Sequence, residues 1–234
     1  MSGPSGPPSI SEDARAALER YLAALAADPR APTSVSDPQR AWKVHALDSL
    51  TGLLVPEVAA ARMIADVGSG GGFPGVALAA SLPRAQVDLI ESVSRRCEFM
   101  RRALAESGIA NARVVCSRSE EWGEGQGRGA YEVVTSRAVG RLSTLAELAS
   151  PLLREGGLLI AWKGRRNEEE ELELARATSA VAMRPEEIRA VGPYAGSRHR
   201  HLHTIRKSAP TPANLPRRPG MAKKRPLGAD GGAD

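Results

Sequence analysis

The chain has 234 residues, of which 42% are hydrophobic, and carries a formal net charge of +5. This length fits one domain with tails, and two cysteines are too few for a disulfide framework or a four-cysteine metal site. The first nine residues lack the basic and apolar regions of a signal peptide, and no run approaches the roughly 20 apolar residues of a membrane span. We therefore expect a cytoplasmic protein, and its basic balance is compatible with an RNA partner.

The first 60 residues predict a leader followed by helices. Residues 1–8 are rich in Gly, Pro and Ser, which indicates a flexible leader. The segment Ser9–Glu12 has the capping-box pattern of a helix start, and apolar residues follow at helical spacing. Pro29 and Pro32 end this helix, and a second helix is expected over Pro38–Leu54, stopped by Pro56. We assign residues 9–60 to an N-terminal helical extension.

Short strands and helices alternate over residues 61–207, which predicts one α/β domain. The expected strands are Met63–Val67, Val87–Glu91, Arg113–Cys116, Tyr131–Thr135, Leu158–Trp162, Glu187–Val191 and Leu202–Arg206. The expected helices are Pro74–Leu82, Ser94–Ser107, Ser143–Arg154 and Glu168–Ala177. Such alternation is typical of an open, mostly parallel sheet, here of seven strands, with helices on both faces. Ligands bind these sheets at the carboxyl ends of the strands, near the switch point after the first strand.

The last segment, residues 208–234, differs from the rest in composition. It contains five prolines and a Lys-Lys-Arg run and shows little periodicity. We predict a basic tail that is disordered or extended until it binds a partner.

The most informative stretch is Ile64–Gly75, in which an apolar run breaks into glycines and then opens a helix. Glycine permits a tight turn and a close approach of the backbone to a ligand, and the helix start offers N–H groups to an anion. Two cofactors fit this loop. The pattern G-x-G-x-x-G of NAD-dependent oxidoreductases is satisfied by Gly70, Gly72 and Gly75. The pattern D-x-G-x-G-x-G, which resembles S-adenosylmethionine-dependent methyltransferases, is satisfied by Asp66, Gly68, Gly70 and Gly72.

Polar residues at other strand ends favour the methyltransferase. Asp66 precedes the first glycine, where a dinucleotide-binding strand is usually apolar, and its carboxylate can hold the ammonium group of a methionine moiety or a water there. Glu91 ends the next strand and can accept both ribose hydroxyls, which either cofactor requires. Residues 117–122 follow the third strand, in position to meet an adenine. Residues 136–138 follow the fourth strand, where a methyl group would be presented.

A series of motifs in order resembles the small-subunit ribosomal RNA methyltransferase G family, also called glucose-inhibited division protein B. The resemblance covers about residues 40–227. Its motifs are HALDSL at His45–Leu50, DVGSGGGFPGVALA, LIESVSRRCEFM, SRSEEW, VVTSRAVGRLSTL, AWKG, RHLHTIRK and LPRRPGMAKKRPL. The chain departs from the family pattern at Ala31–Val35, and it has Leu215 where Tyr is usual.

The resemblance implies a Rossmann-like class I methyltransferase that uses S-adenosyl-L-methionine. Its implied reaction is methyl transfer to N7 of a guanine in the 530 loop of 16S rRNA, within the small subunit or its assembly intermediate. The family's cofactor contacts carry over to Gly68, Phe73, Ser119, Glu120 and Arg137. Together with the residues argued above, the predicted cofactor site comprises Asp66, Gly68, Gly70, Phe73, Glu91, Ser119, Glu120 and Arg137. A ribosome-assembly module without catalysis is the alternative of another class.

Guanine N7 carries a lone pair and no proton, so we assign no catalytic residue and expect catalysis from positioning. Lys163 and His45 are predicted to face RNA, although a solvated Lys163 and a His45 that only fixes the N-terminal helix stay open. Arg137 either orders the cofactor pocket or pairs with Glu120.

Cysteine and histidine positions predict no metal site. The side chains of three histidines would share one face of a strand, but no cysteine or carboxylate completes a metal shell around them. These histidines are His199, His201 and His203. Cys97 and Cys116 are both expected in the core, because free cysteine is among the most buried residue types.

Overall fold

The structure is a computed structural model that describes residues 6–29, 33, 35 and 37–229. The predicted leader up to residue 5, Pro32 and the last five residues of the predicted tail lie outside the described residues. In the described ranges, no helix has the length and apolar character needed to cross a membrane.

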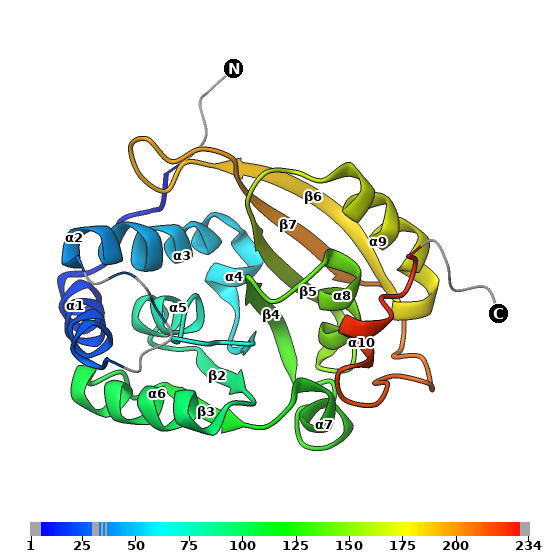
Figure 1. Cartoon of the computed structure of the whole chain (residues 1–234), viewed down its shortest axis with the longest axis horizontal. Helices are drawn as coiled ribbons and strands as arrows, with labels where there is room; N and C mark the ends of the chain where they lie inside the picture. Colours follow the sequence, from blue (N-terminus) through cyan, green and yellow to red (C-terminus); the bar gives the residue numbers. More distant parts are fainter. Residues whose placement is uncertain (1–5, 30–32, 34, 36, 230–234) are drawn as a thin grey trace.

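Seven strands of the described chain form one sheet in the order β3-β2-β1-β4-β5-β7-β6 (Figure 1). Strands β1 to β5 pair in parallel, and β7 runs antiparallel between β5 and β6. The chain order reverses at β1, which lies between β2 and β4, so the loop after β1 is at the switch point. The predicted seven-stranded, mostly parallel α/β fold is confirmed. The strands are β1 Met63–Val67, β2 Gln86–Glu91, β3 Ala112–Cys116, β4 Tyr131–Arg137, β5 Leu153–Lys163, β6 Met183–Val191 and β7 Arg200–Lys207.

Helices cover both faces of the sheet, and each face has its own apolar core (Figure 1). Neighbouring strand residues alternate between the two cores: Ile64 belongs to one and Ala65 to the other. One core contains residues of α1 Glu12–Ala27, α5 Gly75–Ser81 and α6 Ser94–Ser107. The other contains residues of α8 Leu142–Ala149 and α9 Glu168–Val181, with Trp122 of the short helix α7 Ser119–Glu124 packed against it.

The N-terminal segment differs from its prediction at the cap of the first helix and in the character of the second helical stretch. Helix α1 is capped by Ser11, whose side chain accepts from the Ala14 N–H, instead of by Ser9. The second helical stretch ends at Leu54 as predicted, with Val55 extended before Pro56. Pro56 then occupies the first turn of a new helix, where its missing N–H costs nothing. Between Pro38 and Ala60 the backbone hydrogen-bonding pattern changes several times. Its parts are α2 Pro38–Ala41, the π-helical η1 Trp42–Leu47, α3 Asp48–Leu50, the 3-10 helix η2 Thr51–Leu54 and α4 Pro56–Ala60.

Residues 208–229 are ordered against the protein, contrary to the predicted disordered tail. Leu215 is buried, and the chain then forms α10 Met221–Lys224 beside α8 (Figure 1). The Arg217 guanidinium donates to both carboxylate oxygens of Glu147, at 2.7 and 2.5 Å. Because Glu147 is only 2% exposed, its charge requires a buried cation, and the tail supplies it.

Two smaller predictions are also corrected. Helix α8 ends at Ala149 and β5 already begins at Leu153, because Pro151 has no backbone N–H with which to continue the helix. Cys116 is exposed, since it ends β3 at the edge of the sheet, whereas Cys97 is buried as predicted.

Candidate cofactor site

The loop after β1 can be built only with glycine at its turning points. Gly68, Gly70 and Gly72 have φ angles of +69°, +58° and +97°, which are unfavourable for other residues. A Cβ atom on Gly68 would lie 2.5 Å from Cγ2 of Val139. The Gly68 N–H donates to the Ile90 carbonyl at 2.9 Å, which pins the loop to the end of β2. The loop is therefore a preformed concave cradle at the switch point.

Asp66 lies beneath this loop and is fully buried. Its Oδ1 accepts from the Thr135 hydroxyl at 2.8 Å, and its Oδ2 accepts from the Gly75 N–H at 3.2 Å. Burial raises the pKa of this carboxyl to about 7. The predicted contact of Asp66 with a methionine group is thus replaced by a supporting one, in which Asp66 joins the start of α5 to β4.

One cavity of about 350 Å³ opens on the β2 and β3 side of Gly68. Glu91 lines it, and its two oxygens accept from the Gly70 N–H at 3.1 Å and the Val93 N–H at 2.9 Å. Arg96 donates to the same carboxylate at 3.4 Å, and because a carboxylate can accept about four hydrogen bonds, Glu91 retains capacity for a ribose hydroxyl. Ser119 and Glu120, at the start of α7 and both predicted as cofactor contacts, also line this cavity.

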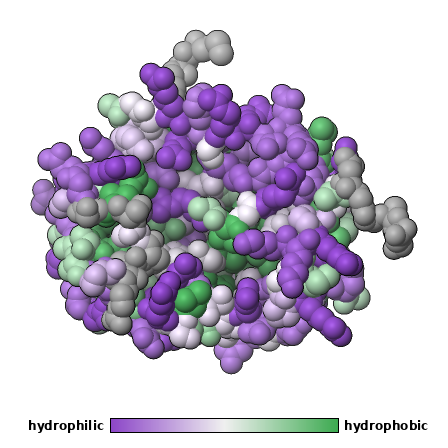
Figure 2. All heavy atoms as spheres, in the orientation of Figure 1, coloured by the Kyte–Doolittle hydropathy of each residue, from purple (hydrophilic) through white to green (hydrophobic). Residues whose placement is uncertain are grey.

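The ordered tail forms a further wall of the same cavity, which the sequence alone did not suggest. Gly220, Ala222, Lys223 and Lys224 line it. The Gly220 N–H donates to Oε1 of Glu120 at 2.8 Å, and the Thr144 hydroxyl donates to the Ala222 carbonyl at 3.0 Å. Figure 2 shows the face of the molecule that is turned to the viewer in Figure 1. Near its middle, hydrophobic and weakly polar side chains are exposed among hydrophilic ones.

A second cavity, of about 280 Å³, opens on the other side of the loop. Phe73 and His45 line it with their rings stacked, the centroids 5.4 Å apart at an angle of 22°. Burial, assisted by the charge of Arg137, lowers the pKa of His45 to about 4, so this imidazole is neutral at neutral pH. Gly68 lines both cavities, which therefore meet at the loop.

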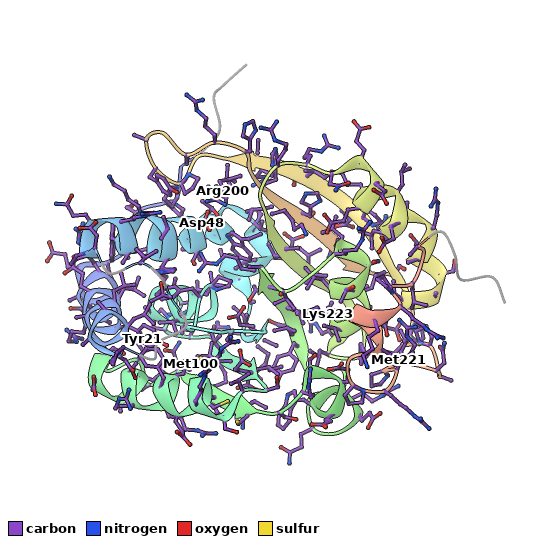
Figure 3. The ribbon with its side chains drawn as sticks, in the orientation of Figure 1. Tyr21, Asp48, Met100, Arg200, Met221 and Lys223 are labelled. Carbon is purple, nitrogen blue, oxygen red and sulfur yellow. The ribbon has the colours of Figure 1, made fainter. Side chains whose placement is uncertain are left out.

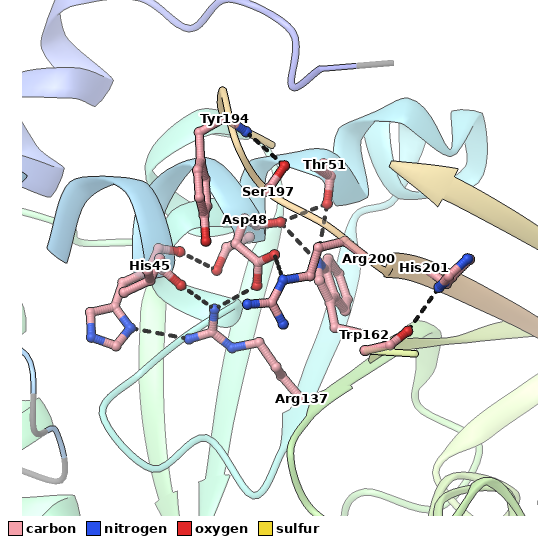
Figure 4. A network of polar contacts seen from close by, with 12 residues as sticks. His45, Asp48, Thr51, Arg137, Trp162, Tyr194, Ser197, Arg200 and His201 are labelled. Atoms are coloured by element: carbon pink, nitrogen blue, oxygen red, sulfur yellow. Dashed lines mark hydrogen bonds and ion pairs between the residues drawn. The ribbon is translucent and has the colours of Figure 1, made fainter. Parts of the chain in front are cut away.

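Arg137 ends β4 and joins it to the π-helical segment (Figure 4). One guanidinium nitrogen donates to the Val44 carbonyl at 2.9 Å and to Oδ2 of Asp48 at 3.1 Å. The alternative of a pair with Glu120 is wrong, because the acid bound to Arg137 is Asp48. Asp48 could be expected either to face RNA or to fix the N-terminal helix on the sheet, but nothing local in the sequence shows that it meets the end of β4.

The remaining predicted residues are engaged with the protein itself. Lys163 donates to the Gly140 carbonyl at 3.0 Å and forms an ion pair with Glu170 at 2.5 Å. Of the three histidines, His199 precedes β7 with φ of +54° and lies outside the strand, whereas His201 and His203 are both in β7 and share a face, as predicted. His201 binds the Gly164 carbonyl, and His203 is buried. In the part of the chain that the structure describes, no cluster of potential metal ligands occurs.

These features fit S-adenosylmethionine. The glycine cradle would be filled by any Cβ at Gly68, an acid ends β2, a serine and an acid open α7, and the cavities meet at the loop. Fold and site together define a class I S-adenosylmethionine-dependent methyltransferase. Solved structures with this fold include the mitomycin 7-O-methyltransferase MmcR, with a TM-score of 0.56 and 14% identity over 84% of this chain and 68% of that one. Another is Aeropyrum pernix fibrillarin with bound S-adenosyl-L-methionine, with a TM-score of 0.50 and 13% identity over 68% and 73%.

Sequence comparison defines the family within that class. Residues 15–202 match the model of the rRNA small subunit methyltransferase G family, and the chain belongs to this family. The ribosomal RNA small subunit methyltransferase G of a Synechococcus strain is 38% identical over 85% of this chain and 78% of its own length. That of Symbiobacterium thermophilum is also 38% identical, over 83% and 82%. The NAD-dependent alternative finds no support in these comparisons.

Proposed function

We propose that the protein transfers the methyl group of S-adenosylmethionine to N7 of a guanine in the 530 loop of 16S rRNA. The proposed substrate is the small ribosomal subunit or its assembly intermediate in the cytoplasm. Family membership supports the reaction class. The observation that carries the proposal is the glycine cradle with one cavity on each side, because one cavity could hold the nucleoside while the other opens beside Arg137.

We assign the nucleoside pocket to the first cavity. Glu91 would accept the ribose hydroxyls, and Ser119 and Glu120 would face the adenine. The backbone of Gly68 and Gly70 would approach the methionine moiety, with Phe73 and Arg137 closing the pocket from the second cavity. When bound, S-adenosylmethionine supplies a positively charged sulfonium whose methyl group is already electrophilic.

The chain's own residues act by orientation and not by proton transfer. N7 of guanine has an in-plane lone pair and no proton, so its attack on a methyl group needs no general base. In agreement, His45 is held by stacking on Phe73 and by its contact with Arg137. Among the described residues that line the two cavities there is no cysteine that could act as a nucleophile. His45 and Lys163 remain our proposed RNA contacts.

The test uses labelled S-adenosylmethionine and small ribosomal subunits that lack this modification. After incubation, chain cleavage at N7-methylguanosine maps the product. We expect a single new cleavage in the 530 loop, and no labelling of subunits that already carry the methyl group. Cofactor binding without any labelled RNA would instead support a non-catalytic assembly role.

A further inference from the structure

A third cleft lies beside the proposed cofactor site, and Arg200, which lines it, has no part in the assignments above. It encloses about 210 Å³ and is lined by the ends of β4 and β5 and the start of β7. We call it the Arg200 cleft. It shares Arg137 and Ala138 with the second cavity, so the two spaces adjoin where β4 ends. The side chains that matter here are Asp48, Arg137, Lys163, Arg200 and His201.

The cleft has more positive than negative charge. Asp48 is the one carboxylate among its described lining residues, and two guanidinium groups share it. Arg137 lies 3.1 Å from Oδ2 of Asp48, and Arg200 lies 3.8 Å from Oδ1. Figure 3 shows Asp48 and Arg200 next to each other at α3, and Figure 4 shows both guanidinium groups turned toward the carboxylate. One arginine charge is therefore left over inside the cleft.

Arg200 also has an unused hydrogen-bond donor. Its Nε is buried and has no hydrogen-bond partner among the described residues, because 3.8 Å to Asp48 is too long for a hydrogen bond. A buried donor without an acceptor is costly, and native proteins rarely leave one. Nε itself is covered, but the Arg200 side chain as a whole is 40% exposed, so a ligand can reach the guanidinium group through its other atoms. The arrangement is suited to an anion that brings its own acceptor oxygens.

The other wall of the cleft is rigid. The Asp48 carbonyl accepts from the Trp162 indole N–H at 2.9 Å and from the Thr51 hydroxyl at 2.6 Å. Asp48 is 6% exposed, so its carboxylate cannot turn away from the two arginines without losing buried contacts. The fixed Asp48 carboxylate therefore holds both guanidinium groups, and with them the surplus positive charge, in one place, as a binding site requires.

We propose that the Arg200 cleft binds a backbone phosphate of the RNA beside the target guanosine, with the Arg200 guanidinium donating to the phosphate oxygens. This inference rests on the proposed function. An arginine fork matches phosphate oxygens, and phosphate contacts set the register of a nucleic acid on a protein. Because the cleft adjoins the second cavity at Arg137 and Ala138, a phosphate held here leaves its base free to enter that cavity. The site would fix where the strand lies while the glycine loop fixes the methyl donor.

The experiment measures binding of unmodified small ribosomal subunits at several salt concentrations, together with the calorimetric affinity for S-adenosylmethionine. The variants are Arg200→Gln, Arg200→Lys and the matched control Arg184→Gln. Arg184 pairs in register with Arg206, at the opposite end of β6 and β7. For Arg200→Gln we expect about tenfold weaker subunit binding and a salt dependence less steep by roughly 0.7 to 0.9. Arg200→Lys should keep the slope, and Arg184→Gln should match the unaltered protein.

Several outcomes would overturn the proposal. They are an unchanged salt slope in Arg200→Gln, an equal loss in Arg184→Gln, weakened cofactor binding in Arg200→Gln, or no binding of subunits by the unaltered protein. Retained cofactor affinity shows at the same time that Arg200→Gln is folded. If the unaltered protein binds subunits with the expected slope but transfers no methyl group, the proposed reaction fails while the phosphate site stands.

Discussion

Gly68 has no side chain, and this allows the loop after β1 to pack directly against Val139. The backbone there has φ of +69°, and a Cβ would lie 2.5 Å from the Val139 side chain. Replacing any glycine that has a positive φ costs about 1–2 kcal/mol of backbone strain. At Gly68 the clash with Val139 is an additional cost.

We therefore predict that Gly68→Ala weakens S-adenosylmethionine binding by at least about tenfold, since Val139 and the loop must move apart. Gly129→Ala is the control, because Gly129 has φ of +62° and a Cβ added there would meet nothing within 4 Å. Calorimetric titration should show normal affinity in the control. Equal affinities in both variants would mean that the loop does not hold the cofactor.

Asp66 makes the free energy of unfolding depend on pH, and a single substitution can isolate its contribution. Burial raises its pKa from 3.8 to about 7, so the folded protein prefers the protonated carboxyl. Stability from this group is therefore fully present below pH 3.8 and is lost as the pH rises to about 7. Asp66→Asn removes the titration.

The measurement is urea unfolding of both proteins over a pH series. The free energy of unfolding of the unaltered protein, relative to that of Asp66→Asn, should fall between about pH 4 and 7 and be constant above. His45, whose pKa is lowered by burial to about 4, contributes the opposite slope but is present in both proteins and cancels. A flat difference would contradict the buried, uncharged Asp66.

At the scale of elements, residues 208–229 form a wall of the proposed cofactor cavity instead of a free arm. Its attachment depends on the pair between Arg217 and Glu147, and its contact with the site passes through Gly220 and Glu120. A substitution in the Arg217–Glu147 pair should therefore change the affinity for the cofactor.

We predict that Arg217→Gln lowers the unfolding midpoint, because it leaves Glu147 buried without its cation, and weakens S-adenosylmethionine binding by about three- to tenfold. Arg218→Gln is the matched control, since Arg218 is the next residue and is exposed. Protease sensitivity after Lys207 should rise only in Arg217→Gln. Unchanged affinity in that variant would separate the tail from cofactor binding.

At the scale of the whole molecule, the N-terminal helix and the methyltransferase segment share one core. Tyr21 of α1 is fully buried, donates to the Gly71 carbonyl at 3.1 Å and packs edge-on against Phe73 and Phe99. The sheet then separates this core from the one under α8, where Leu145 is buried. Every central strand contributes to both, so neither core can be lost alone.

We accordingly predict one unfolding transition in calorimetry. Tyr21→Ala on one face and Leu145→Ala on the other should each lower that single transition, by about 2–5 kcal/mol of unfolding free energy. The exposed Leu172→Ala provides the control, with little effect. Two peaks, only one of which moves in each variant, would show that the faces unfold independently.

The sequence by itself determined the α/β alternation, the glycine loop and the family. These features depend on neighbours along the chain: apolar spacing sets strand and helix, and only glycine accepts the positive φ angles at residues 68, 70 and 72. Tertiary structure decided what the charged residues contact. Arg137 and Asp48 are 89 residues apart in the chain, and Gly220 and Glu120 are 100 apart. No local pattern encodes such pairs, because they form only when the sheet brings strand ends together and buried charges must find partners. For the same reason the docked tail, the supporting place of Asp66 and the Arg200 cleft emerged only from the folded molecule.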